Sequence, residues 1–324
     1  MESLLYTLLV YSPCMTNLRP QILKLPQVVG RAKSSQHPLV SVITPNYNHA
    51  HYLEDTLIGV NRQTYPNLEH IVIDGGSTDN SISIIQNYPD VNWISEKDRG
   101  MWDGYFKGLR ISKAKYILTC FSSDMFIDPN WVQNCVDAME DDSKISMIWG
   151  GVATANVSGE LIESHSWPTH MQDIPSEKDM FFYWLATSVN LPETNYCVPR
   201  EVMLSLISEE DLSENEFESD QDIALLFQYR FHSEGYMSKY LPFTPNFVRK
   251  HEDQRTVAWN STGLFGIKMA TYAQWHRQFR RSLLLGKSQH FRASDGSILE
   301  TYGWFKIVYF TFFQKLRIVM KGQI

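Results

Sequence analysis

The chain has 324 residues, 43% of them hydrophobic and 20% charged, so it can bury the core of one large globular domain or of two smaller ones. Its formal net charge is −7, which argues against nucleic acid as the main partner because that partner needs a basic protein face. The cysteines show no CxxC spacing, and we expect free thiols in a reducing cytosol at Cys14, Cys120, Cys135 and Cys197.

An alternation of strand and helix patterns follows an N-terminal extension, residues 1–37, that shows no clear periodicity. The β-branched run Leu39–Thr44 predicts a buried strand. Apolar side chains then recur at Leu53, Leu57 and Val60, which is the spacing of one helix face.

The alternation continues through the first half of the chain. Further strands are predicted at Leu68–Ile73, Val91–Ser95, Tyr116–Thr119 and Ile145–Val152. Helical faces between them carry Ile82 and Ile85, then Met101, Tyr105 and Leu109, then Val132, Val136 and Met139. Strands that alternate with helices predict an α/β fold with a mainly parallel, Rossmann-like sheet and right-handed crossovers.

The second half of the chain has a weaker pattern. Residues 153–200 are mixed and rich in aromatic side chains, and residues 209–222 form an acidic run. Ile223–Phe231 is apolar and predicts a helix, and beyond Arg255 we expect helices with basic faces.

Two aspartates follow predicted strands, at the sheet edge where open α/β folds bind ligands. Asp74 precedes Gly75-Gly76-Ser77, which suits close approach of a ligand to the backbone or, equally, a tight turn before a helix. Asp124 follows Tyr116–Thr119, and its carboxylate can bind a divalent cation that neutralises a diphosphate leaving group. The alternative role for Asp124 is to cap a turn or helix ahead of Pro129.

Three other segments carry charged residues whose role stays open from the pattern alone. The charged run Ser95–Asp103 joins a strand to a helix, as a solvated face or as part of the ligand edge. Asp220 lies in the acidic run and is either solvated or a general base near an acceptor hydroxyl. His251 is either structural or a ligand.

Together these segments resemble the family-2 glycosyltransferases, which have the A-type glycosyltransferase (GT-A) fold. The resemblance covers residues 38–256. The matching motifs are VSVITPNYN (Val40–Asn48), QTYPN (Gln63–Asn67), IVIDGGSTD (Ile71–Asp79), SEKDRGMWDGYFKG (Ser95–Gly108) and SSDMFIDP (Ser122–Pro129), with weaker matches at VPREV (Val198–Val202), SDQDIALLF (Ser219–Phe227) and RKHEDQRT (Arg249–Thr256).

This resemblance implies a nucleotide-diphosphate sugar donor and a divalent metal, Mn or Mg. It implies that the nucleotide pocket is lined by Pro45, Tyr47 and Asp74, and that a base stacks on Tyr47. It places Asp98 and Asp103 near the ribose and the sugar, with Lys107 behind them near phosphate. It assigns metal binding to Asp124, closure over the metal and diphosphate to His251, and the role of catalytic base to Asp220.

The chain departs from the family pattern at two positions. Met125 replaces the second acidic residue of the metal-binding pair, and methionine is a poor ligand for a hard cation. Metal binding is therefore expected to rest on Asp124, His251, diphosphate oxygens and water. Phe106 stands where the family commonly has Asn, and we expect it to alter the pocket near the sugar.

The expected organisation is an extension (1–37), a catalytic domain (38–256) and a helical C-terminal region (257–324). Tyr302–Met320 mixes aromatic and basic residues, which suits a membrane surface or a helix docked on the core. No apolar run reaches the roughly 18–20 residues that cross a bilayer. We expect a cytoplasmic transferase, peripheral on the inner face of the membrane, that acts on a glycan or lipid-linked acceptor of a cell-surface polysaccharide.

Two alternatives stay open. A nucleotidyltransferase shares the sheet topology, but Pro45–His51 lacks the glycine-rich basic loop that such enzymes use. A catalytically degenerate transferase that binds a glycan or a partner protein is favoured by Met125.

Overall fold

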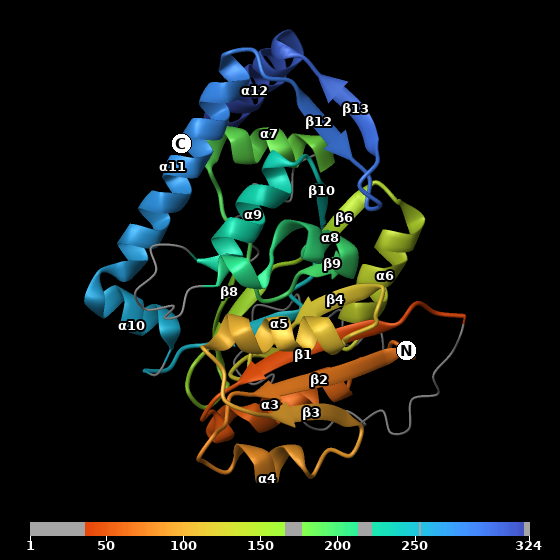
Figure 1. Cartoon of the computed structure of the whole chain (residues 1–324), viewed down its shortest axis with the longest axis vertical. Coiled ribbons are helices and arrows are strands. Elements are labelled where there is room, and N and C mark those ends of the chain that lie inside the picture. Colours follow the sequence, from red (N-terminus) through yellow and green to blue (C-terminus); the bar gives the residue numbers. More distant parts are fainter. Residues whose placement is uncertain (1–35, 166–176, 213–221, 253, 321–324) are drawn as a thin grey trace.

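The computed structural model describes residues 36–165, 177–212, 222–252 and 254–320, and in these residues three sheets are flanked by helices (Figure 1). The central sheet contains β1 (Val40–Asn46), β2 (Leu68–Asp74), β3 (Val91–Ser95), β4 (Tyr116–Thr119), β6 (Ile145–Trp149), β9 (Cys197–Pro199) and β10 (Met237–Tyr240). The second sheet contains β5 (Met125–Phe126), β7 (Val152–Ala155), β8 (Leu161–His165) and β11 (Asn246–Arg249). The third is a hairpin of β12 (Gln289–Arg292) and β13 (Ile298–Tyr302).

The helices of the described residues follow the strands in alternation through the first half and cluster in the second. They are α3 (Ala50–Asn61), α4 (Ser81–Ile85), α5 (Met101–Ile111), α6 (Trp131–Asp141), α7 (Glu177–Thr187), α8 (Arg200–Leu206), a short 3₁₀ helix (Glu209–Asp211), α9 (Ile223–Ser233), α10 (Arg255–Thr262), α11 (Leu264–Leu284) and α12 (Trp304–Met320).

The central sheet has the strand order β10-β6-β9-β4-β1-β2-β3. Its ladders are parallel between β1 and β2, β1 and β4, β2 and β3, and β6 and β10, whereas β9 runs antiparallel to both β4 and β6. The prediction of a mainly parallel α/β sheet with a helical C-terminal region is therefore confirmed. Helix α5 covers β1 and β2, so its first turn lies at the carboxyl ends of these strands.

One prediction about a strand is wrong. The run Ile145–Val152 is not one strand, because the chain leaves the central sheet after Trp149 and enters the second sheet at Val152. Asn195 explains the break, since its side chain accepts a hydrogen bond from the Gly150 N–H at 3.2 Å and donates to the Gly151 carbonyl at 2.9 Å. The helical region beyond Arg255 also contains a hairpin of β12 and β13, which the sequence did not predict.

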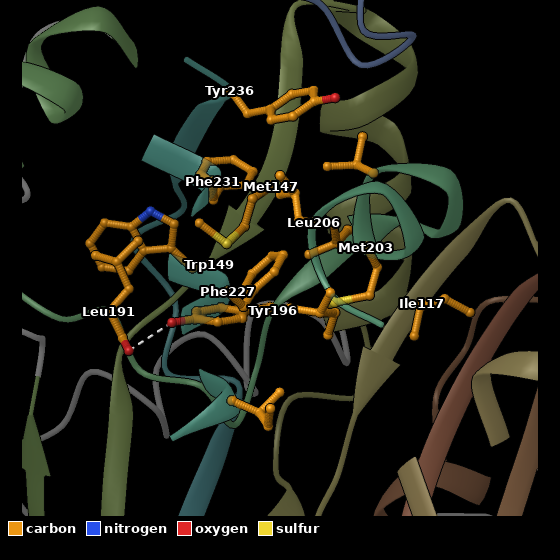
Figure 2. Packing of buried hydrophobic residues seen from close by; sticks show 14 of the residues in the cluster. Ile117, Met147, Trp149, Leu191, Tyr196, Met203, Leu206, Phe227, Phe231 and Tyr236 are labelled. Atoms are coloured by element: carbon orange, nitrogen blue, oxygen red, sulfur yellow. Dashed lines mark hydrogen bonds between the residues drawn. The ribbon is translucent and has the colours of Figure 1, made fainter. Parts of the chain in front are cut away.

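The largest buried cluster lies between the central sheet and helices α8 and α9, and Figure 2 shows its aromatic and methionine side chains. Tyr196 donates its hydroxyl to the Leu191 carbonyl at 2.7 Å inside this cluster, so a buried polar group is satisfied there. The cluster thereby fixes the loop between Leu191 and Tyr196. This loop carries Glu193 and Thr194, which face the cavity described below.

Figure 1 shows α12 and the β12–β13 hairpin at the top of the molecule, and α11 runs up the left side from α10 to meet them. Helix α12 packs on α7 through a buried face that includes Ile307 and Ile318. No helix among the described residues is both long enough and apolar enough to span a bilayer.

We predict that Gly59→Ala destabilises the protein although alanine usually favours a helix by about 1 kcal/mol. A Cβ atom at Gly59 in α3 would lie 2.8 Å from the backbone nitrogen of Phe126 in β5, and overpacking of this kind costs about 1–3 kcal/mol. The matched control is Gly266→Ala in α11, where no atom lies within 4 Å and the free energy of unfolding should rise by up to about 1 kcal/mol. Denaturant unfolding measures both. A stabilising Gly59→Ala would contradict the tight contact between α3 and β5.

Candidate active site

A cavity of about 570 Å³ opens at the carboxyl ends of the parallel strands. The segments that follow β1, β2, β3 and β4 form one side, and they contribute Tyr47, Gly75, Asp98 and Asp124. The loop before β9 and the segment from β11 to α10 form the other side. This is the edge of an open α/β sheet at which ligands bind.

Asp74, the last residue of β2, is fully buried beside the cavity and is not among the residues that line it. Its carboxylate accepts hydrogen bonds from Asn46 Nδ2 at 2.8 Å, from Ser95 Oγ at 2.7 Å, and from both the hydroxyl and the backbone N–H of Ser77. Burial acts to raise the pKa of Asp74, but these hydrogen bonds outweigh it and hold the pKa below its ordinary value. Asp74 therefore ties the ends of β1, β2 and β3 together.

Asp98 lines the cavity, and Gly75 makes room for it. A Cβ atom at Gly75 would lie 2.6 Å from Asp98 Oδ2, so a larger residue there would displace the carboxylate. Burial raises the pKa of Asp98, and the hydrogen bond from the Gly100 N–H at 3.0 Å opposes that rise. This carboxylate is available to accept hydrogen bonds from a ligand in the cavity.

Asp103 and Lys107 lie on α5 beside the cavity rather than in its lining. Arg99 Nη2 donates to Asp103 Oδ1 at 2.8 Å, and Lys107 Nζ lies 3.0 Å from Glu96 Oε1. Burial acts to raise the pKa of Asp103, but the two hydrogen bonds from Arg99 outweigh this effect and lower the pKa overall. The geometry fits a network that orders the loop carrying Asp98.

Asp124 lies in the cavity wall and is 2% exposed. Burial raises its pKa to about 7, although the Arg249 N–H, at 3.4 Å from Oδ1, and the charge of Arg249 act in the opposite direction. Met125, the next residue, is fully buried and packs with Ile127 and Phe247 in an apolar cluster away from the cavity. A carboxylate at this position would therefore not reach the cavity without rearrangement of β5.

Arg249 connects Asp124 to the rest of the fold. Its guanidinium pairs with Asp55 at 2.5 Å and donates to the carbonyls of Ser123 at 3.1 Å and Val157 at 2.7 Å. Its guanidinium carbon also lies 5.0 Å from the ring centre of Tyr52, in cation–π contact. Because Arg249 is 1% exposed, these contacts hold the loop before β5 in one position.

His251 lies two residues beyond Arg249 and lines the cavity. Its ring packs 4.8 Å from that of Tyr52 and 5.5 Å from that of His49. His49 Nδ1 is in turn 2.8 Å from Ser122 Oγ, so two histidines meet the loop that carries Asp124. His49 was not predicted from the sequence as a site residue, since it belongs to no recognised metal spacing.

Glu193 and Arg255 form a second charged group that the sequence did not predict. Arg255 lies 3.5 Å from Glu193 and 3.8 Å from Asp222, and its guanidinium carbon is 4.3 Å from the ring centre of Trp259. Burial raises the pKa of Glu193 to about 7, with Arg255 opposing and Asp222 reinforcing the rise. Arg255 thus joins the loop before β9, the start of α9 and α10 on one side of the cavity.

The structure brings five predicted site residues to this one cavity, namely Pro45, Tyr47, Asp98, Asp124 and His251. Three others, Asp74, Asp103 and Lys107, lie beside or beneath it. Asp220 falls outside the described residues, but Asp222 caps α9 by accepting a hydrogen bond from the Leu225 N–H at 3.1 Å. Phe106 is 2% exposed and belongs to the core, so it does not line the pocket as expected.

A parallel sheet with acidic side chains and a cavity at its carboxyl edge defines an α/β protein with a ligand-binding site. Residues 41–194, slightly under half of the chain, match the family model described as glycosyl transferase family 2, so this segment resembles the family-2 glycosyltransferases. The mannosyltransferase PcManGT of Pyrobaculum calidifontis, solved in complex with GDP-Man and Mn²⁺, shares the GT-A fold with a TM-score of 0.51 at 18% identity, over 79% of this chain and 68% of that one.

Curated relatives match less than half of the chain. A chondroitin synthase of Escherichia coli is 28% identical over 159 residues, which cover 48% of this chain and 23% of that protein. An uncharacterized glycosyltransferase of Mycobacterium tuberculosis is 34% identical over 116 residues, which cover 35% of this chain and 44% of that protein. The chain thus spans less than half the length of these relatives.

We predict that Glu193→Gln changes how stability depends on pH. The folded protein holds the Glu193 proton up to about pH 7, whereas the unfolded chain releases it near its ordinary pKa of about 4.3, so this group stabilises the fold at low pH and loses that contribution as pH rises to 7. The variant lacks this loss, and its free energy of unfolding relative to wild type should rise by about 1–3 kcal/mol between pH 4 and pH 8. Glu210→Gln, at an exposed glutamate, is the control. Parallel stability curves for wild type and Glu193→Gln would disprove the raised pKa.

Proposed function

We propose that the chain transfers a hexose-type sugar from a nucleotide diphosphate sugar to a hydroxyl of a glycan or lipid-linked acceptor, with inversion, in the biosynthesis of a cell-surface polysaccharide. One observation carries this proposal. Asp98, Asp124 and His251 share a single cavity with Glu193 and Arg255, at the carboxyl edge of the sheet of a family-2 domain. The relatives named chondroitin synthase support a polysaccharide product.

The side of the cavity formed by β1, β2 and β3 suits the donor. The cavity volume of about 570 Å³ lies within the range of small-molecule and cofactor sites. Tyr47 is 57% exposed at the cavity, where its ring can stack on a nucleotide base. The hydroxyl groups of ribose and sugar can bind the Asp98 carboxylate, which Gly75 and Gly100 leave accessible to the cavity.

A divalent metal fits this site only if the donor helps to hold it. Among the described residues no group of three or more His, Cys, Asp or Glu side chains could hold a metal by itself. Asp124 and His251 both face the cavity, and cations such as Mg²⁺ commonly bind to one or two protein ligands together with substrate phosphates. When bound, the metal would neutralise the charge of the departing diphosphate.

The acceptor side is formed by the loop before β9 and the start of α9. We assign the role of general base to Asp220, two residues before the α9 cap Asp222 that Arg255 approaches. Asp220 takes the proton of the acceptor hydroxyl while the hydroxyl oxygen forms a bond to the anomeric carbon of the donor sugar. The bond from that carbon to the diphosphate oxygen breaks on the opposite face. A single displacement of this kind inverts the anomeric configuration.

We predict that Asp220→Asn lowers turnover by about 10²–10⁴-fold, the usual contribution of a general base, and leaves donor affinity nearly unchanged. Steady-state transfer assays and donor titration measure the two quantities. Glu210→Gln, which removes an exposed carboxylate of the same acidic run, should keep wild-type turnover. Equal turnover in Asp220→Asn and wild type rules out Asp220 as the base. If the wild-type protein binds no nucleotide diphosphate sugar, the proposed function as a whole is wrong.

We predict that nucleoside diphosphates and their sugars raise the melting temperature, and that Mn²⁺ adds to the shift only when the diphosphate is present. The dependence on diphosphate follows because the described residues supply too few ligands for Mn²⁺ alone. Asp124→Asn and His251→Ala should abolish the Mn²⁺ increment and keep part of the nucleotide shift. Asp141→Asn, at an exposed end of α6, is the control. An equal Mn²⁺ increment in Asp124→Asn means that this carboxylate is not a ligand.

A further inference from the structure

Helix α12 leaves one continuous apolar face exposed. Large apolar side chains on this face are exposed along the whole helix, from Phe305 at 82% to Met320 at 73%; the others are Tyr309, Phe312, Phe313, Leu316 and Val319. At 3.6 residues per turn these seven positions fall within an arc of about 120°. We call this set the α12 stripe. The opposite face is buried, with Ile307 and Ile318 in the core and Phe310 stacked 5.3 Å from Phe182.

Positive charge surrounds the α12 stripe. Residues 264–324 contain ten Lys and Arg but only two acidic residues, although the whole chain has a net charge of −7. On a helical projection, Lys306 and Arg317 lie along one edge of the stripe and Lys315 along the other. Lys306 lies 3.5 Å from Glu300 and Arg317 lies 4.0 Å from Asp179, so nearby carboxylates partly offset the charge of these two residues. Aromatic side chains between rows of cations are the pattern of helices that lie in the interface of an anionic bilayer.

A groove beside the stripe adds a second, independent observation. It has a volume of about 180 Å³ between α7, α11 and α12, and apolar side chains such as Leu283, Leu284 and Val308 line most of it. Its lining also includes two cations, Arg280 and Lys315, and no acidic residue. Burial and then the charge of Arg280 lower the pKa of Lys315, so these like charges are near enough to repel and an anion between them would be stabilised.

We propose that the α12 stripe and this groove dock the protein on a bilayer that contains anionic phospholipid. The stripe enters the interfacial layer, Arg280 and Lys315 bind a lipid phosphate, and the apolar groove holds the first part of an acyl chain. Figure 1 places α12 at the far end of the long axis from β1, β2 and β3, so the docked face leaves the cavity at the ends of these strands open to solvent. A second copy of the chain fits this face less well, because a two-fold contact would bring the same cations together.

The test is co-sedimentation of the full chain with vesicles of phosphatidylcholine, alone or mixed with phosphatidylglycerol. We expect binding to the mixed vesicles to be on the order of 100-fold tighter, since each cation near an anionic surface contributes about fivefold, and to weaken as salt is added. F305S/F313S should bind at least tenfold more weakly. V157S/I162S, which removes equally exposed apolar side chains from the region of β7 and β8, should bind as wild type does.

R280Q/K315Q tests the groove independently of the stripe. Removal of two cations should reduce the preference for anionic lipid about 25-fold and leave binding to phosphatidylcholine unchanged. Absence of wild-type binding to mixed vesicles overturns the proposal, as does equal binding by F305S/F313S. Sedimentation velocity tests the alternative that the face binds a second copy of the chain. That alternative holds if the wild type is a dimer, F305S/F313S is a monomer, and the wild type does not bind vesicles. None of these measurements depends on sugar transfer, so they stand apart from the proposed function.

Discussion

The buried ion pair between Arg249 and Asp55 is the interaction on which the cavity depends. It joins β11, from the second sheet, to α3, from the first crossover, and the same guanidinium holds the Ser123 carbonyl in the loop that presents Asp124. Both partners are at most 5% exposed, and removal of one partner from such a pair leaves an uncompensated charge that costs about 3–5 kcal/mol. The position of Asp124 is therefore set by a contact between residues almost two hundred positions apart, and His251 follows Arg249 by two residues into the same cavity.

The fold changes the interpretation of Met125, the residue that replaces the second acidic residue of the family pattern. Met125 packs in the apolar cluster of the second sheet, so the change to methionine does not remove a carboxylate from the cavity as this backbone is arranged. The cavity instead receives a second carboxylate from Glu193, on the loop that the Tyr196 and Asn195 hydrogen bonds hold in place. Met125 is therefore weak evidence for a catalytically degenerate protein, because its side chain packs outside the cavity.

Much of the fold could be predicted from the sequence because the first four strands and their helices have strong local patterns. The carboxyl edge of a parallel sheet then brings Pro45, Tyr47, Asp98 and Asp124 together without further information. Side-chain direction could not be predicted in the same way, since the packing of α5 on β1 turns Asp103 and Lys107 toward Arg99 and Glu96 instead of the cavity. Glu193 and Arg255 were missed because their pairing joins distant segments, and the break after Trp149 depends on Asn195, which no local pattern reveals.

The position of β9 has a consequence for how the protein can form. This strand lies between β4 and β6 and is the link between the two parts of the central sheet, yet it begins at Cys197, after the segment that matches the family model has ended at residue 194. A fragment limited to that segment would leave β6 unpaired on both sides and β4 unpaired on one side, and such unpaired strand edges are templates for aggregation. During synthesis the central sheet can be completed only after β9 and β10 have emerged, so we expect residues 41–194 not to fold on their own.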